Sequence, residues 1–314
     1  MQKMECRVIF EQAQIIPGMK LVDDGNWLFI LVATSNCVYR IQLPLPRQKD
    51  RYLLSGLSSS LFDDDQNRFK LPFTDVVLCS SSCVSDSSAC FVLALQSGDL
   101  AFIKLLERGK GSCNVVKKTS RISKIWSGLN PWAAGEAVEC PDDLVICDVM
   151  KRDFKAVGIC KDHRLRIWSC KRLDCEAQFD ITKYQNNNPS VLAGQHHKIR
   201  MKCGAAGSCL ISVAFSLGLD SVFINFKLDA TIPTIQHIST IHCFESANHN
   251  LVDYQLTSDR LLWGLWRDAD DQPILSVCDI TIQTWHEVAM MHSPPSDVSI
   301  DPSSRFCSNP SSYF

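Results

Sequence analysis

The apolar positions of this 314-residue chain recur as pairs of strand-like runs, and a short polar turn separates the two runs of each pair. In one pair the runs FKAVGIC and RLRIWSC flank the turn residues Lys161, Asp162 and His163. Two runs joined in this way are typical of a β-hairpin. The pattern predicts five hairpins, at residues 27–43, 90–106, 154–170, 209–228 and 261–280.

The first run of each predicted hairpin is apolar on both faces of the strand. In LLWGLW, residues 261–266, Trp263 and Trp266 point to opposite faces because side chains alternate along a strand. We expect both to be buried, one against each neighbouring layer. Sheets stacked radially around an axis would cover both faces, and no segment between the hairpins shows a long helical period. We therefore predict an all-β fold, a degenerate WD40-like β-propeller, with a two-sheet sandwich as the alternative.

The turn at Asp162 and His163 has a structural and a catalytic interpretation. Both are residue types enriched where φ is positive, as a tight hairpin turn requires. On the following strand Arg166 and Trp168 share one face, where the guanidinium can stack on the indole ring. We prefer the structural turn, because no nucleophile or paired carboxylate accompanies His163 in the sequence.

Composition and charge argue against nucleic acid and membrane as partners. The chain is 46% hydrophobic and 21% charged, with a formal net charge of -2, so it lacks the basic excess of a nucleic-acid-binding protein. Its longest strongly apolar stretch, WLFILVA, is too short to span a bilayer, and the N-terminal residues do not resemble a signal peptide. We expect a soluble, intracellular protein with no direct contact to nucleic acid and no membrane insertion.

The sixteen cysteines are dispersed, mostly within apolar runs such as GIC, VVLC and LVIC, and the sequence has no CxxC pair. Buried thiols in a reducing compartment fit this pattern, so we predict that the cysteines bind no metal and that no cofactor is present. The alternative is a zinc site made of Cys160, His163, Cys170 and Cys175. It is disfavoured because Cys160 lies inside a predicted strand rather than in a tight knuckle.

No catalytic motif occurs in its required context. GKGSC lacks the spacing of a phosphate-binding loop, GAAGSC is not a nucleophile elbow, and HExxH is absent. We therefore predict that the protein is not an enzyme and assign no catalytic residue. The residues singled out are structural: Asp162, His163, Arg166, Trp168, Trp263 and Trp266.

The C-terminal segment SPPSDVSIDPSSRFCSNPSSYF is rich in Ser and Pro, a composition typical of disorder. The predicted organisation is therefore a β-propeller over residues 1–292 followed by a disordered tail over residues 293–314.

Several stretches resemble the N-terminal β-propeller of the large outer-ring (Y-complex) nucleoporin of the nuclear pore complex. They are CKDHRLRIWSCK at 160–171, LAGQHHKIR at 192–200 and VDYQLTSDRLLWGLWRDADDQ at 252–272, together with IIPG and VYRIQLPLP near the start. The Gly-His and Trp-Asp dipeptides of regular WD repeats are absent. Cys170 stands where animal relatives carry an aromatic residue, and Arg267 where they tend to carry His.

The resemblance implies an incomplete seven-bladed ring that acts as a structural scaffold of the outer ring, at the nuclear pore of the nuclear envelope. It implies a role in nucleocytoplasmic transport of protein and mRNA through contacts with other Y-complex nucleoporins, including a small WD-repeat nucleoporin. Because the family's propeller begins earlier and is followed by a helical domain, it also implies a fragment, a short isoform or a truncated gene model. The alternative function is a non-nucleoporin propeller adaptor that binds peptides or protein partners.

Overall fold

The computed structural model describes residues 15–23, 27–44, 60–85, 88–106, 110–116, 141–148, 153–184, 197–203, 208–217, 220–243, 249–257 and 260–288. Within these ranges the chain forms twenty strands in five four-stranded antiparallel sheets, which we call blades 1 to 5 in chain order. The predicted all-β fold is confirmed. Five blades, rather than the seven of a complete ring, are present in the described part of the chain.

The bounds of the elements are as follows. Blade 1 contains β1 (Ile15–Asp23), β2 (Trp27–Thr34), β3 (Cys37–Pro44) and β4 (Arg68–Lys70), with α1 (Ser60–Asp63) between β3 and β4. Blade 2 contains β5 (Val77–Ser85), β6 (Ser88–Leu95), β7 (Leu100–Leu105) and β8 (Gly111–Val116). Blade 3 contains β9 (Pro141–Asp148), β10 (Phe154–Cys160), β11 (Arg164–Ser169) and β12 (Asp174–Asp180), followed by a short 3₁₀ helix (Thr182–Tyr184). Blade 4 contains β13 (His197–Cys203), β14 (Ser208–Leu217), β15 (Asp220–Asp229) and β16 (Thr234–Cys243). Blade 5 contains β17 (Asn250–Leu256), β18 (Leu261–Arg267), β19 (Pro273–Asp279) and β20 (Trp285–Val288).

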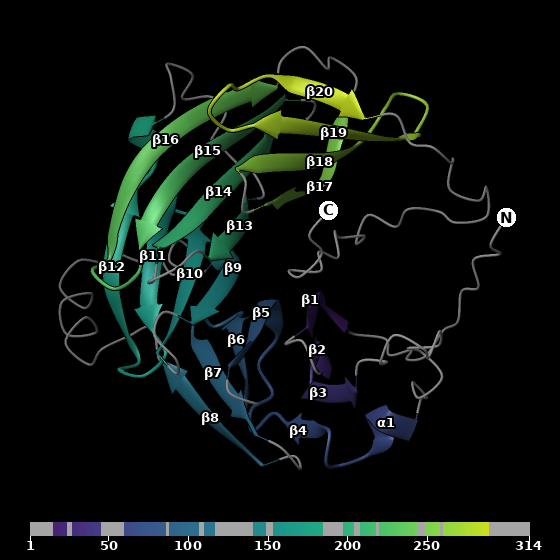
Figure 1. Cartoon of the computed structure of the whole chain (residues 1–314). Helices are drawn as coiled ribbons and strands as arrows, with labels where there is room; N and C mark the ends of the chain where they lie inside the picture. The colour runs from purple at the N-terminus through teal and green to yellow at the C-terminus, as the bar shows by residue number, and fades with distance from the viewer. Residues whose placement is uncertain are drawn as a thin grey trace, which may run out of the picture.

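The five blades lie around a common axis as an arc, with blade 1 and blade 5 at its two ends (Figure 1). The first strand of each blade is the inner one, and the inner strands of successive blades contact one another in the order β1, β5, β9, β13 and β17. This radial arrangement is that of a β-propeller. Within the described residues, no helix has the length and apolar character needed to cross a membrane.

Each of the five predicted hairpins coincides with the two central strands of a blade. The pairs are β2–β3, β6–β7, β10–β11, β14–β15 and β18–β19, all antiparallel. Central strands are covered by neighbouring blades, which explains why the first strand of each pair is apolar on both faces. The turn of the predicted hairpin at 209–228, residues 218 and 219, and the expected tail at 293–314 lie outside the described residues.

Each pair of neighbouring blades encloses an apolar core of its own. Phe29 of blade 1 packs in one cluster with Phe91 of blade 2, and Phe102 of blade 2 shares the next cluster with Trp168 of blade 3. The core between blades 3 and 4 is the largest described, and it contains mainly β-branched and aromatic residues such as Val157, Ile167, Ile211, Val213 and Phe215. The apolar cores therefore join each blade to the next blade along the chain, as in other stacked β architectures.

Blade 5 differs from the central blades because its two faces are unequally covered. Trp266, only 3% exposed, lies in the core between blades 4 and 5 with Phe223 and Tyr254. On the opposite face Leu261, Trp263 and Leu265 are only partly buried. The expectation that both tryptophans would be buried is therefore wrong for Trp263, because in the described residues no further blade packs on that face.

Candidate functional site

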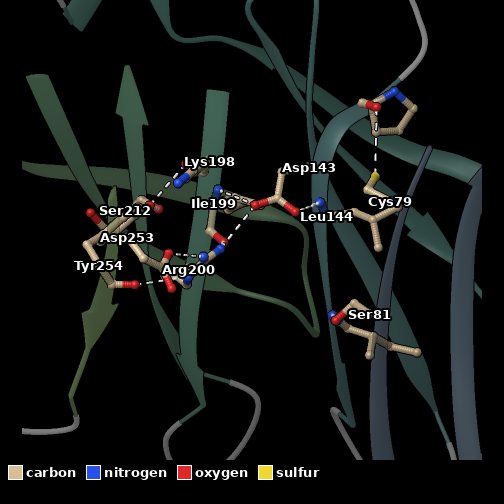
Figure 2. Close-up of polar contacts among 12 residues, drawn as sticks. Cys79, Ser81, Asp143, Leu144, Lys198, Ile199, Arg200, Ser212, Asp253 and Tyr254 are labelled. Atoms are coloured by element: carbon tan, nitrogen blue, oxygen red, sulfur yellow. Dashed lines mark hydrogen bonds and ion pairs between the residues drawn. The ribbon is translucent and has the colours of Figure 1, made fainter. Parts of the chain in front are cut away.

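Polar side chains of three inner strands meet between blades 3, 4 and 5, and we call this group the Arg200 clamp. Its members are Asp143 of β9, Arg200 of β13, and Asp253 and Tyr254 of β17 (Figure 2). The side chains of Arg200, Asp143 and Asp253 are respectively 13%, 6% and 1% exposed.

Arg200 forms an ion pair with a carboxylate on either side of its own blade. Its Nη1 lies 3.0 Å from Oδ2 of Asp143, and its Nη2 donates to Oδ1 of Asp253. Its Nε donates to the backbone carbonyl of Tyr254 at 3.0 Å. A guanidinium presents several donors in a fixed plane, so one Arg can join two carboxylates that belong to different strands.

The carboxylate of Asp143 is also bound by backbone amides. Oδ1 accepts a hydrogen bond from the N–H of Leu144 at 3.0 Å, and Oδ2 accepts one from the N–H of Ile199 at 3.1 Å. The second bond crosses from blade 3 to blade 4. Buried charges are tolerated when they are paired and hydrogen-bonded, and Asp143 meets both conditions.

Tyr254 completes the clamp from the side of blade 5. Its hydroxyl lies 2.6 Å from the carbonyl oxygen of Ser212 and 3.0 Å from that of Lys198, both in blade 4. The guanidinium of Arg200 lies over its ring, 5.3 Å from the ring centroid. Burial raises the pKa of the Tyr254 hydroxyl well above its ordinary value, so this group remains a neutral hydrogen-bond donor.

The electrostatics of the clamp favour a permanently charged arginine. Burial alone would lower the pKa of Arg200, but the carboxylates of Asp143 and Asp253 outweigh it and raise the pKa above the ordinary value. Within the clamp, charges of opposite sign thus face one another between blades. This arrangement joins blades 3, 4 and 5 through paired, buried charges.

A second set of polar contacts joins blades 2 and 3 (Figure 2). The Ser81 hydroxyl oxygen accepts a hydrogen bond from the N–H of Ile146 at 3.1 Å. The Cys79 thiol lies 3.9 Å from the carbonyl oxygen of Pro141. Polar contacts between inner strands therefore run from blade 2 to blade 5.

The turn residues singled out from the sequence form a local structural motif. His163 has φ 59°, in the left-handed region, between β10 and β11. Asp162 binds the Arg166 guanidinium with both carboxylate oxygens, Oδ1 lying 2.7 Å from Nη1. The expected stacking of Arg166 on Trp168 is not among the cation–π contacts of the described residues. The guanidinium is held by the Asp162 carboxylate instead.

Trp168 is 7% exposed and belongs to the core between blades 2 and 3. Its ring lies over Gly158 on the paired strand, where an added Cβ would come within 3.0 Å of the indole. A side chain at Gly158 would therefore require the indole to shift by a few tenths of an ångström. Trp168 thus packs in the core between blades 2 and 3.

The cysteines of the alternative zinc site are not brought together. Cys160 is fully buried at the end of β10, whereas Cys175 is exposed on β12. In the described ranges, the group of possible metal ligands that does gather is Cys147, Cys203 and Cys209. Sequence reasoning missed this cluster, because its members come from two blades, although CGAAGSC could have been read as two cysteines facing each other across a hairpin.

Sequence reasoning also missed the Arg200 clamp. Arg200 ends the stretch LAGQHHKIR, and Asp253 and Tyr254 lie in VDYQ, so the clamp joins two of the stretches that carry the resemblance. The available signal was a charged residue within each of the stretches that form β9, β13 and β17. Their pairing could not be read from the chain, since Arg200 is 57 residues from Asp143 and 53 from Asp253.

Comparison with solved structures supports the architecture. The β-propeller domain of Myceliophteria thermophila Cps50 (Swd1) superposes with a TM-score of 0.55 at 11% sequence identity, over 89% of this chain and 74% of that one. At this identity the similarity concerns the fold alone.

Sequence comparison identifies the family. Nuclear pore complex protein Nup160 of Mus musculus is 25% identical over 321 residues, which cover 94% of this chain and 23% of that protein. The Homo sapiens protein of the same name is 24% identical over 326 residues, with 94% and 22% covered. The chain thus spans less than a quarter of the length of these relatives. Since the family model "Nucleoporin Nup120/160, beta-propeller domain" matches residues 1–313, the chain belongs to the Nup120/160 nucleoporin β-propeller family.

Proposed function

We propose that the chain is a structural scaffold component of the nuclear pore complex outer ring that acts through protein–protein contacts and not through catalysis. The observation that carries this proposal is the family match over residues 1–313. The clamp between blades adds physical support, because its charges are used to hold sheets together. The proposed location is the nuclear pore at the nuclear envelope, in support of nucleocytoplasmic transport and mRNA export.

The proposed partners are other outer-ring (Y-complex) nucleoporins, including a small WD-repeat nucleoporin. Two exposed isoleucines are suited to testing such contacts. Ile232 and Ile282 are 70% and 71% exposed, and each follows a strand-ending Asp-x-Thr sequence, one in blade 4 and one in blade 5. Apolar side chains at exposed positions are available to a partner, and replacing them costs the fold little.

The test is to express the tagged chain in eukaryotic cells, image it and identify the proteins that co-purify with it. We expect fluorescence at the nuclear rim and recovery of outer-ring nucleoporins. The double substitution Ile232→Asp with Ile282→Asp probes the surface, and Asp270→Asn, at another exposed turn, is its matched control. A folded chain that stays diffuse and recovers no pore protein contradicts the proposal, and selective recovery of short peptides would favour the adaptor function.

We also propose that the five blades belong to an incomplete seven-bladed ring. The partly buried face formed by Leu261, Trp263 and Leu265 supports this, since the equivalent strands of blades 2 to 4 have protein on both faces. A further blade packed there would bury this face. The division into a propeller over residues 1–292 and a tail over 293–314 stays a prediction.

A further inference from the structure

Three thiols from two blades gather at the rim where β13 ends and β14 begins. Cys147 lies on β9, Cys203 is the last residue of β13, and Cys209 lies near the start of β14. Their three Sγ atoms all lie within 4.8 Å of one another. Cys203 and Cys209 are direct cross-strand partners, so the hairpin itself positions two of the thiols.

The cluster is closed on one side and accessible on the other. Cys147 and Cys209 are each 2% exposed and belong to the apolar core between blades 3 and 4, whereas Cys203 is exposed. Cys203 and Cys209 also line a cavity of about 530 Å³. An ion can therefore reach the thiols from solvent, while two of its ligands are held rigidly by the core.

The walls of this cavity are cationic. Lys202, Lys227 and Arg260 line it together with His237. A cationic wall opposes a bare metal ion but favours a negatively charged thiolate complex. Three thiolates around a divalent ion leave a net charge of about minus one, which these side chains can offset.

We propose that Cys147, Cys203 and Cys209 bind one Zn²⁺ ion as three thiolates, with the fourth coordination position directed to the cavity. Zinc is a thiophilic ion that forms Zn–S bonds of about 2.3 Å in tetrahedral geometry, which places neighbouring sulfur atoms about 3.8 Å apart. The observed cluster needs to contract by no more than about 1 Å to reach this spacing. Each thiol releases its proton to solvent as its bond to zinc forms.

Bound zinc would connect β9 to the β13–β14 hairpin, and so would fasten blade 3 to blade 4. This inference is independent of the proposed scaffold function and departs from the expectation that the cysteines bind no metal.

Metal analysis of the full chain, purified under reducing conditions, washed with chelator and titrated with Zn²⁺, tests the proposal. We expect one zinc per chain in the unchanged protein. Cys203→Ser should weaken zinc binding by about 100-fold or more, since even the loss of an outer partner of a metal ligand costs about 10- to 100-fold. Cys203 is exposed, so this variant should fold. Cys175→Ser, at an exposed cysteine of β12 outside the cluster, is the matched control and should keep its zinc.

X-ray absorption of the zinc-loaded chain provides a second readout. We expect three sulfur ligands at about 2.3 Å, and one fewer in any Cys203→Ser protein that still holds zinc. The proposal is overturned if the unchanged chain retains no stoichiometric zinc, if Cys203→Ser binds it equally well, or if the coordination shell lacks sulfur. A Cys203–Cys209 disulfide that persists after purification under reducing conditions would overturn it as well.

Discussion

Arg200 joins carboxylates from two different blades, so its replacement leaves both Asp143 and Asp253 without their counter-charge. Removing one partner of a buried ion pair typically costs about 3–5 kcal/mol, because the remaining charge stays desolvated. We therefore expect Arg200→Met to lower the free energy of unfolding by about this amount. Urea unfolding followed by tryptophan fluorescence measures it.

Arg267→Met is the control for this prediction. Arg267 pairs with Asp271 on the surface, where the Asp271 side chain is 75% exposed. Exposed ion pairs contribute about 0–1 kcal/mol, so this variant should unfold at nearly the same urea concentration as the unchanged chain. Equal losses in the two variants would show that burial of the Arg200 clamp contributes nothing.

The two tryptophans of β18 differ in burial: Trp266 is buried, whereas Trp263 is partly buried. Trp266 packs against Trp285 with ring centroids 5.5 Å apart, and its Nε1 donates to the Ser276 hydroxyl at 2.6 Å. Trp266→Ala should cost about 3–5 kcal/mol, because apolar contacts are lost and a cavity remains. Trp263→Ala should cost clearly less in the same urea assay. A larger loss at Trp263 would mean that its face is covered in solution.

Alternation along LLWGLW was sufficient to place Trp263 and Trp266 on opposite faces. It was not sufficient to decide which face is covered, because coverage depends on a neighbouring blade and not on the strand itself. The Asp162–Arg166 pair shows the same limit. The residue types at Asp162 and His163 identified the turn. The Arg166 guanidinium, however, binds the Asp162 carboxylate and does not stack on the Trp168 ring, because a charge-assisted hydrogen bond is the stronger interaction.

At the scale of elements, three strands end in the same Asp-x-Thr turn. They are β12, β15 and β19, which end at Asp180, Asp229 and Asp279. In blade 4 the Asp229 Oδ1 accepts hydrogen bonds from the Thr231 hydroxyl at 2.5 Å and from the Thr231 N–H at 2.9 Å. The Asp229 side chain thus forms the hydrogen bonds that a backbone carbonyl would form in a turn, and it stabilises the turn that ends β15.

The Asp-x-Thr turns predict that the free energy of unfolding depends on pH. Hydrogen bonds from the Thr231 hydroxyl, and then from the N–H groups of Ile232 and Thr231, lower the pKa of Asp229. A folded-state pKa below the unfolded value means that the charged form stabilises the fold above about pH 3.9, and that this stability is lost as the pH falls through the folded-state pKa. Asp229→Asn should therefore destabilise the chain near neutral pH, and the difference should shrink in acid.

Urea unfolding at about pH 7 and about pH 3 tests this dependence. Asp270→Asn, at an exposed turn residue of blade 5, should show no comparable change between the two conditions. A destabilisation by Asp229→Asn that grows in acid would contradict the prediction.

The hairpins were the most predictable elements, because each is local in sequence and its two apolar runs are joined by a short turn. The outer strands were less predictable. β8 and β12 are mostly exposed, and β4 comes shortly after the three consecutive aspartates at 63–65. Each of these outer strands pairs with the central strand beside it, and the alternation of apolar and polar residues is weak in such edge strands.

At the scale of the whole molecule, the order of the blades follows the chain, so the arc could be anticipated from repeated hairpins. The contacts between blades could not, because each joins residues roughly one blade apart in sequence. The Cys147–Cys203–Cys209 cluster and the Arg200 clamp are both of this kind. A single sequence shows the charges and thiols of each strand, whereas their partners appear only when the strands are placed side by side.

The arc also predicts that stability is unevenly distributed along the chain. Blade 5 is joined to blade 4 by one core and by the Arg200 clamp, and its other face is only partly buried. Blade 2 makes no contact with Arg200 and has cores on both faces. An element that has few contacts with its neighbours unfolds locally more often, and its amide hydrogens exchange during these openings. The amides of β18 and β19 should therefore exchange faster than those of β6 and β7.

Hydrogen exchange of the Arg200→Met variant tests this distribution. Losing the clamp should speed exchange in β18 and β19 by about 100-fold or more, since about 3 kcal/mol corresponds to roughly two factors of ten. Exchange in β6 and β7 should change far less, and Arg267→Met, which alters β18 itself, should leave both pairs nearly unchanged. Equal acceleration in β6–β7 and β18–β19 would show that the five blades open as one cooperative unit, so that the clamp stabilises the whole arc and not the attachment of its last blade.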